Sequence, residues 1–94
     1  MDVVKVVGWD EGGDEAWVEG GSPEEVERLA GEGRVVLVVL EGDVSGQVAA
    51  ASVYGWLGAR VFRTAFPEEV RTALDMVESL AGRRPPAVTR RGLA

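Results

Sequence analysis

The sequence predicts a small α/β domain with a mainly parallel sheet and the element order β-β-α-β-α-β-α. Two observations support this fold class. Valine-rich, strand-like runs alternate with helical segments, and the central run at 34–40 (RVVLVVL) is apolar after its first residue. Such a run is typical of a strand that is covered on both faces, as in a parallel sheet. With 94 residues in all, we expect one domain at 1–82 and a basic, flexible tail at 83–94.

Two short strands are predicted at the beginning of the chain. Residues 3–7 (VVKVV) are mostly β-branched, and residues 16–19 (AWVE) form a second, shorter run. An acidic turn with two glycines, at 10–15 (DEGGDE), lies between them. If the strands pair as a hairpin, Trp9 and Trp17 lie near one another. We favour this packing over the stacking of a flat ligand between the two rings.

The first and last helices have clear start signals. The first follows Ser22, which can cap it, and Pro23, which suits the first helical position, and it ends near Gly31. The last is predicted over 67–81 from apolar residues at helical spacing. The strand before it is predicted at 60–64 (RVFRT).

The helix predicted at 44–57 has an unusual composition, because none of its fourteen residues is charged. A helix that is apolar or small on all sides is normally covered on all sides. The helices of such a small domain lie on the outside of its sheet. We therefore expect something beyond the domain itself to cover this helix.

The formal net charge of −6 is unevenly distributed. Residues 1–82 contain sixteen acidic and six basic side chains, whereas residues 83–94 contain four arginines and no acid. An acidic body repels phosphate backbones, so we expect no nucleic-acid partner. The tail either docks on an acidic surface, such as that of a neighbouring copy, or only increases solubility, and we favour the second interpretation.

Cysteine and histidine are both absent from the sequence. Their absence excludes disulfides, thiolate chemistry and histidine-based catalysis, together with the commonest metal ligands. We therefore expect no metal site, no cofactor and no catalytic residues. An enzyme that relies on carboxylates alone, with Glu41 and Asp43 as its acid–base pair, is the hypothesis that we favour least.

Two features bear on location. The N-terminus lacks the basic start and the apolar core of a signal peptide. The longest uncharged stretch, at 44–59, is too short and too polar to span a membrane. We therefore expect a cytoplasmic protein with no membrane partner.

Three segments resemble the end of dihydropteroate synthase: 49–64 (AAASVYGWLGARVFRT), 73–77 (ALDMV) and 90–94 (RRGLA). The resemblance is to the last two strand–helix units of that family's (β/α)8 barrel, and it covers roughly residues 34–94. It implies a partial barrel, because a complete one needs about 250 residues.

The resemblance also bears on activity. The family joins a pterin pyrophosphate to p-aminobenzoate in folate synthesis, and its last strand ends in an Arg-x-His pair that helps hold the pyrophosphate. Here Arg63 matches the arginine, but Ala65 stands where the histidine would be. The family's Ser-Arg-Lys loop, whose lysine contacts the pterin, is replaced by Glu41-Gly42-Asp43. The resemblance therefore implies a relative without synthase activity.

Dihydropteroate synthases resemble one another in dimerising through their last helices, and the resemblance implies that this surface is retained. We therefore predict a protein that acts by association, either with a second copy of itself or with a full-length dihydropteroate synthase. The residues predicted to form the interface are Ala50, Ala51, Tyr54, Trp56 and Leu57. The alternative is a module that binds a pterin or another phosphorylated small molecule through Arg63 and Thr64, at the end of the last strand.

Overall fold

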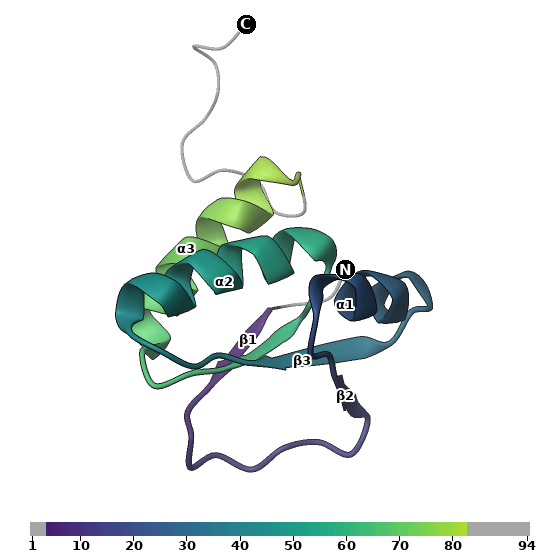
Figure 1. Ribbon diagram of the computed structural model, residues 1–94, viewed down its shortest axis with the longest axis horizontal. Helices are drawn as coiled ribbons and strands as arrows, with labels where there is room; N and C mark the ends of the chain where they lie inside the picture. The colour runs from purple at the N-terminus through teal and green to yellow at the C-terminus, as the bar shows by residue number, and fades with distance from the viewer. Residues whose placement is uncertain (1–3, 83–94) are drawn as a thin grey trace, which may run out of the picture.

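The computed structural model describes residues 4–82 and contains four strands and three helices in the predicted order (Figure 1). The strands are β1 (Lys5–Val7), β2 (Trp17–Glu19), β3 (Val35–Val39) and β4 (Val61–Arg63). The helices are α1 (Pro23–Gly31), α2 (Val44–Leu57) and α3 (Pro67–Leu80). The tail predicted at 83–94 lies outside the described residues.

All four strands form one parallel sheet in the order β1-β4-β3-β2. β3 and β4 lie at its centre, with Leu37 opposite Val61 and Val39 opposite Arg63. β1 pairs with β4, and β2 pairs with β3. The prediction of an α/β fold with a mainly parallel sheet is confirmed, and the arrangement is that of part of a (β/α)8 barrel.

The first two strands do not form the predicted hairpin, so that prediction is wrong. β1 and β2 lie on opposite edges of the sheet, and residues 8–16 cross from one edge to the other (Figure 1). Trp9 lies in this crossing segment and is 48% exposed. The prediction failed because it considered only neighbours in the sequence. Instead, β1 pairs in parallel with β4 and β2 pairs in parallel with β3, so each short strand lies beside a central strand that contains valine.

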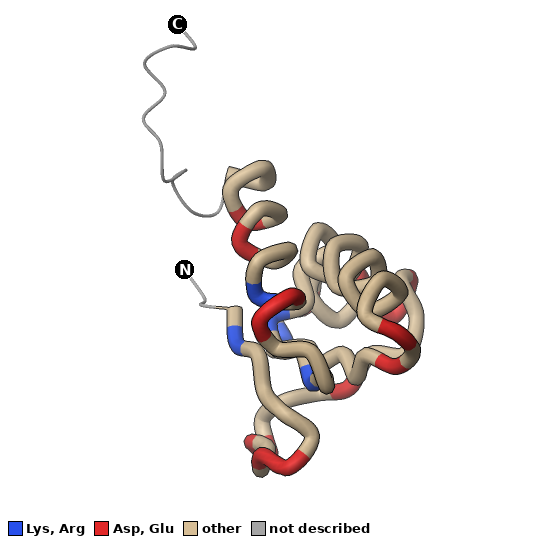
Figure 2. The backbone as a smooth tube through the Cα atoms, turned by 90° about the vertical axis from the view of Figure 1, so that its left-hand side faces the viewer, with Lys and Arg blue, Asp and Glu red and all other residues tan. Residues whose placement is uncertain are grey.

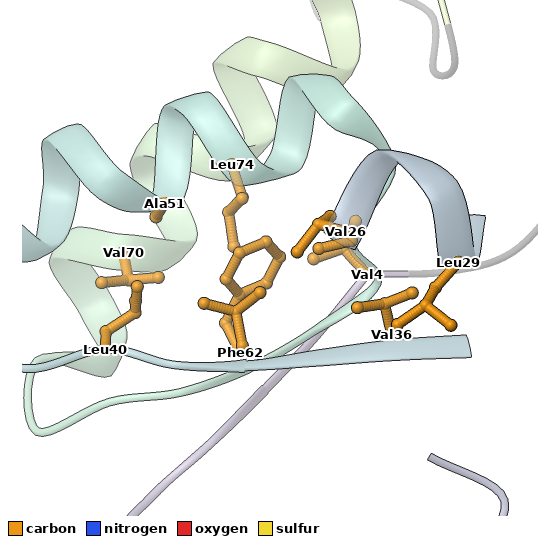
Figure 3. Packing of buried hydrophobic residues seen from close by; sticks show 11 residues of the cluster. Val4, Val26, Leu29, Val36, Leu40, Ala51, Phe62, Val70 and Leu74 are labelled. Carbon is orange, nitrogen blue, oxygen red and sulfur yellow. The ribbon is translucent and has the colours of Figure 1, made fainter. Parts of the chain in front are cut away.

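All three helices pack on one face of the sheet (Figure 1). Side chains alternate along a strand, so every second residue points toward the helices. Figure 3 shows Phe62 and Leu74, both fully buried, between the sheet and the helices. The remaining members of this core are Val4, Val26, Leu29, Val36, Val38, Leu40, Ala51, Ala59 and Val70.

The face of the sheet away from the helices is covered less completely than the sequence predicts. In β3, Val36 and Val38 are buried against the helices, whereas the alternate residues Val35, Leu37 and Val39 are half-buried. The expectation that this strand is covered on both faces is therefore met only on the helical side. The other face is crossed by the segment between β1 and β2 (Figure 1).

The helix starts follow local signals in the sequence. The Ser22 hydroxyl accepts the N–H of Glu25 at 3.1 Å, and the Glu25 carboxylate accepts the N–H of Gly21 at 2.7 Å. The first bond satisfies one free N–H of the first turn of α1, and the second holds the residue before the cap. Asp43 caps α2 by accepting the N–H of Gly46 at 2.8 Å. Of the helices within residues 4–82, none is both long enough and apolar enough to cross a membrane.

A buried ion pair joins the last turns of α3 to the residue before β4. Nη1 and Nη2 of Arg60 donate to Oε1 and Oε2 of Glu78 at 3.0 and 2.9 Å. The two side chains are only 9% and 7% exposed. Two parallel hydrogen bonds fix the direction of the guanidinium as well as its distance. The pair therefore fixes how α3 lies against the sheet.

We expect Glu78→Ala to lower the free energy of unfolding by about 3–5 kcal/mol, because the substitution leaves the buried Arg60 guanidinium without this carboxylate. Urea denaturation followed by tryptophan fluorescence measures the change. Glu32→Ala is the matched control, since Glu32 contacts Arg28 at 3.4 Å on the exposed surface. Its loss should change stability by less than about 1 kcal/mol. Equal effects of the two substitutions would contradict the role given to the buried pair.

Candidate functional site

Arg63, the first of the two residues predicted to bind an anion, ends β4 on the face away from the helices. Its neighbour Phe62 belongs to the helical core, so the Arg63 side chain points the other way. Nη1 of Arg63 donates to the carbonyl oxygens of Gly8 at 2.9 Å and Glu11 at 2.7 Å. The guanidinium therefore binds the backbone of its own chain, just after β1.

Thr64, the second predicted residue, is fully buried toward the helices. Its hydroxyl donates to Oε1 of Gln47 at 2.5 Å and accepts the N–H of Phe66 at 2.9 Å. Gln47 is buried too, and its Nε2 donates to the carbonyl oxygen of Gly42 at 2.9 Å. These bonds tie the end of β4 to the first turn of α2 and to the loop after β3. Thr64 and Arg63 therefore lie on opposite sides of the sheet and do not face one ligand.

Gln47 is a residue that the sequence analysis did not single out. It has the only amide side chain in α2. A buried amide needs hydrogen-bond partners, so an isolated glutamine in an otherwise apolar helix is a signal that would have found it. Its hydrogen bonds to Gly42 and Thr64 give it a structural role.

The carboxyl ends of the strands are acidic. Glu41 and Asp43 follow β3, and Asp10 and Glu11 follow β1, with all four side chains exposed. Among the basic residues within 4–82, Arg63 alone ends a strand. Figure 2 shows acidic segments gathered in the crossing segment and at the loop that leads into α2. This distribution of charge opposes the binding of an anionic ligand at the strand ends.

α2 exposes an uncharged apolar surface. Val53 and Trp56 are 53% and 56% exposed, and Val44 is exposed at the beginning of the helix. Two further exposed apolar side chains, Met76 and Leu80, lie on α3, which packs beside α2. We call the exposed side of α2 the α2 face, and it comprises Val44, Ser45, Ala49, Val53 and Trp56.

The five residues predicted to form an interface fall into two groups. Trp56 is largely exposed and belongs to the α2 face. Ala50, Tyr54 and Leu57 are half-buried and pack against the core, and Ala51 is completely buried in it. Ala51 therefore contributes to the interior of this chain and not to its surface.

The small residues of α2 partly serve the contact with α3. A Cβ atom added at Gly55 would lie 2.8 Å from Cδ2 of Leu74, which is fully buried. This distance is shorter than a carbon–carbon contact allows, so a glycine is needed where the two helices approach. At this position the close approach is between two helices of the same chain.

No protein-family model matches the chain. Among curated proteins, it is similar to the inactive dihydropteroate synthase 2 of Mycobacterium tuberculosis and of Mycobacterium bovis, with 40% identity over 62 residues. The matched part is 66% of this chain and 20% of each relative, so the chain spans about a fifth of the length of these proteins.

Among solved structures, the chain is similar to the Mycobacterium tuberculosis protein Rv1207, with a TM-score of 0.59 and 31% identity. The match covers 72% of this chain and 32% of that protein. The predicted resemblance to dihydropteroate synthase is thus confirmed by the comparison with curated proteins, and the solved structure supports it.

We expect Thr64→Val to lower the free energy of unfolding by about 1–3 kcal/mol, because it leaves the buried Gln47 carbonyl without its donor. Thermal and urea denaturation measure the loss. Thr72→Val is the matched control, since its hydroxyl bonds to the Glu68 carbonyl on the exposed side of α3 at 3.1 Å. The control should change stability by less than about 0.5 kcal/mol. An unaltered stability of Thr64→Val would show that the hydroxyl has no structural role.

Proposed function

We propose that this chain is a non-catalytic relative of dihydropteroate synthase that acts by protein–protein association through the α2 face. One observation carries the proposal: the helix has no charged residue, yet Val53 and Trp56 are each more than half exposed. Exposed apolar surfaces of this kind are typical of interaction sites, and tryptophan is the residue most enriched at their centres.

Several observations support the non-catalytic part of the proposal. The similar curated proteins are named inactive dihydropteroate synthases. In this chain no histidine is present, and Ala65 follows Thr64 where the resemblance places one. Arg63 is bound to backbone carbonyl oxygens, and Thr64 is buried within a structural network. Of the family's Arg-x-His pair, the arginine is therefore engaged by the backbone of its own chain and the histidine is missing.

A second copy of the same chain is the partner that we favour. The chain as a whole has a net charge of −6, so most of its surfaces repel one another when two copies meet. The α2 face is free of that repulsion because it lacks charged side chains. Two copies related by a twofold axis can bury the same face against itself. A full-length dihydropteroate synthase is the alternative partner for the same face.

We expect Trp56→Asp to convert a dimer into monomers, because it places a charge in the middle of an apolar interface. Light scattering coupled to size-exclusion chromatography measures the mass. Trp9→Asp is the matched control, since Trp9 is 48% exposed but lies outside α2. It should leave the mass unchanged. A dimer that survives Trp56→Asp, or a wild-type chain that is monomeric alone and in a mixture with a synthase, would overturn the proposal.

The alternative function, binding of a pterin or another phosphorylated small molecule through Arg63, leads to a separate prediction. Because Arg63 is bound to Gly8 and Glu11 and the strand ends are acidic, we expect no heat of binding with pterin pyrophosphate at millimolar concentration. Isothermal titration calorimetry tests this. A measurable affinity that disappears in Arg63→Ala would instead favour the binding module.

A further inference from the structure

The segment 8–16, which we call the strap, crosses the face of the sheet that the helices leave open. In Figure 1 it runs from the end of β1 to the start of β2 on the side of the sheet opposite α1, α2 and α3. In a (β/α)8 barrel, the side without helices is the inside of the barrel. The strap therefore occupies the position of a barrel interior.

A single arginine holds the strap to the sheet. Nη1 of Arg63 donates to both Gly8 and Glu11, and these two residues also close a turn on each other. The N–H of Glu11 reaches the Gly8 carbonyl at 3.2 Å, and the Glu11 carboxylate accepts the N–H of Gly8 at 2.6 Å. Further along, Gly13 lies beside Arg63 and Trp17: a Cβ atom there would be 3.6 Å from Nη2 and 3.7 Å from the indole ring.

The face beneath the strap is apolar apart from three charged residues that alternate onto it, Lys5, Arg63 and Glu19. Val61 and Val7 are 2% and 7% exposed, although neither belongs to the core between sheet and helices. The β3 residues of this face, Val35, Leu37 and Val39, are half-buried. Lifting the strap would expose these valine and leucine side chains to water.

Both edges of the sheet are open within residues 4–82, where β1 pairs with β4 alone and β2 with β3 alone. Unpaired edges of a parallel sheet are templates for further strands. The exposed charges next to these edges are of opposite sign, with Lys5 on β1 and Glu19 on β2. The β1 edge of one copy can therefore meet the β2 edge of a second copy without repulsion.

Two copies joined in this way would close a barrel. Each copy supplies four parallel strands, and a twofold rotation about the barrel axis keeps all strands parallel while joining each β1 to the partner's β2 edge. The resulting eight strands match the number in a (β/α)8 barrel. Such a barrel has an interior just wide enough for side chains, so it cannot contain two straps.

We propose that the strap is an autoinhibitory cover, latched by Arg63, that prevents the sheet from pairing edge to edge with a second copy of this chain. The strap buries the apolar face in the single copy and excludes the partner from it. The inference concerns the face opposite the α2 face and does not depend on association through α2.

The test is Arg63→Leu, which removes the donor to both carbonyl oxygens and leaves a shorter, apolar side chain. We expect the amides of Gly8 and Glu11 to exchange hydrogen at least about tenfold faster, because the turn they close is released. We also expect the mass from light scattering to rise about twofold relative to the wild type. Arg63→Lys keeps a cationic donor group and should give intermediate values of exchange rate and mass. It tests the latch even if Arg63→Leu does not fold.

A second substitution identifies the surface that forms the new assembly. The N–H of Gly20 donates to β3 through Leu37, so the N–H of Glu19 points to the open edge. Glu19→Pro in the Arg63→Leu chain removes that edge donor and should return the mass to the wild-type value. Arg28→Leu, on the exposed surface of α1, is the matched control and should change neither mass nor exchange.

The outcomes separate this inference from association through α2. In Trp56→Asp chains, adding Arg63→Leu should still raise the mass about twofold, since the α2 face takes no part. Faster exchange of the strap amides with unchanged mass would overturn the autoinhibitory role. Unchanged exchange in Arg63→Leu would overturn the latch. A higher mass that persists with Glu19→Pro would overturn pairing through the sheet edge.

Discussion

The pairing of β3 with β4 at the centre of the sheet is the contact on which the rest of the molecule depends. α2 connects these two strands, so their parallel pairing places it on one face of the sheet, and Phe62 then points from the sheet toward the helices. The buried pair of Arg60 and Glu78 fixes α3 against the sheet. All three helices consequently lie on one side, and within residues 4–82 the outside of α2 and the inside of the sheet are both left without a covering helix (Figure 1).

The two surfaces differ in whether another segment of the chain covers them. The inside of the sheet is crossed by its own strap, which buries Val61 and leaves β3 half-buried. The α2 face has no such cover within residues 4–82, and Trp56 remains more than half exposed on it. Because of this difference, we propose that the α2 face associates at all times, whereas the open face of the sheet associates only when the strap is released. Burial of apolar surface drives both kinds of association, and the strap controls whether the face of the sheet is available.

Arg63 and Thr64, the two residues predicted to bind an anion, both make hydrogen bonds within the chain. Arg63 binds two carbonyl oxygens of the strap, and Thr64 bonds to Gln47 on the other side of the sheet. Neighbouring residues along a strand point to opposite faces of the sheet. Arg63 therefore holds the strap on one face, and Thr64 holds α2 on the other. An arginine at a strand end attracts whatever carbonyl or anionic oxygen is nearest, and here the chain itself supplies it.

The sequence alone determined the elements and their order, because these depend on neighbours in the chain: the cap at Ser22, the valine runs and the helical spacing of α3. The residues predicted to bind an anion or to form an interface lie on β4 and α2 or directly after them, but the sequence did not indicate which side of the sheet or helix each one occupies. α2 has no polar face, so nothing in its sequence indicates which side turns inward, and only packing against α3 decided that Ala51 is buried and Trp56 exposed. The parallel pairing of β1 and β2 with different central strands also required the tertiary structure. Strand partners far apart in the chain are selected by burial and register across the whole sheet, and no local pattern records that choice.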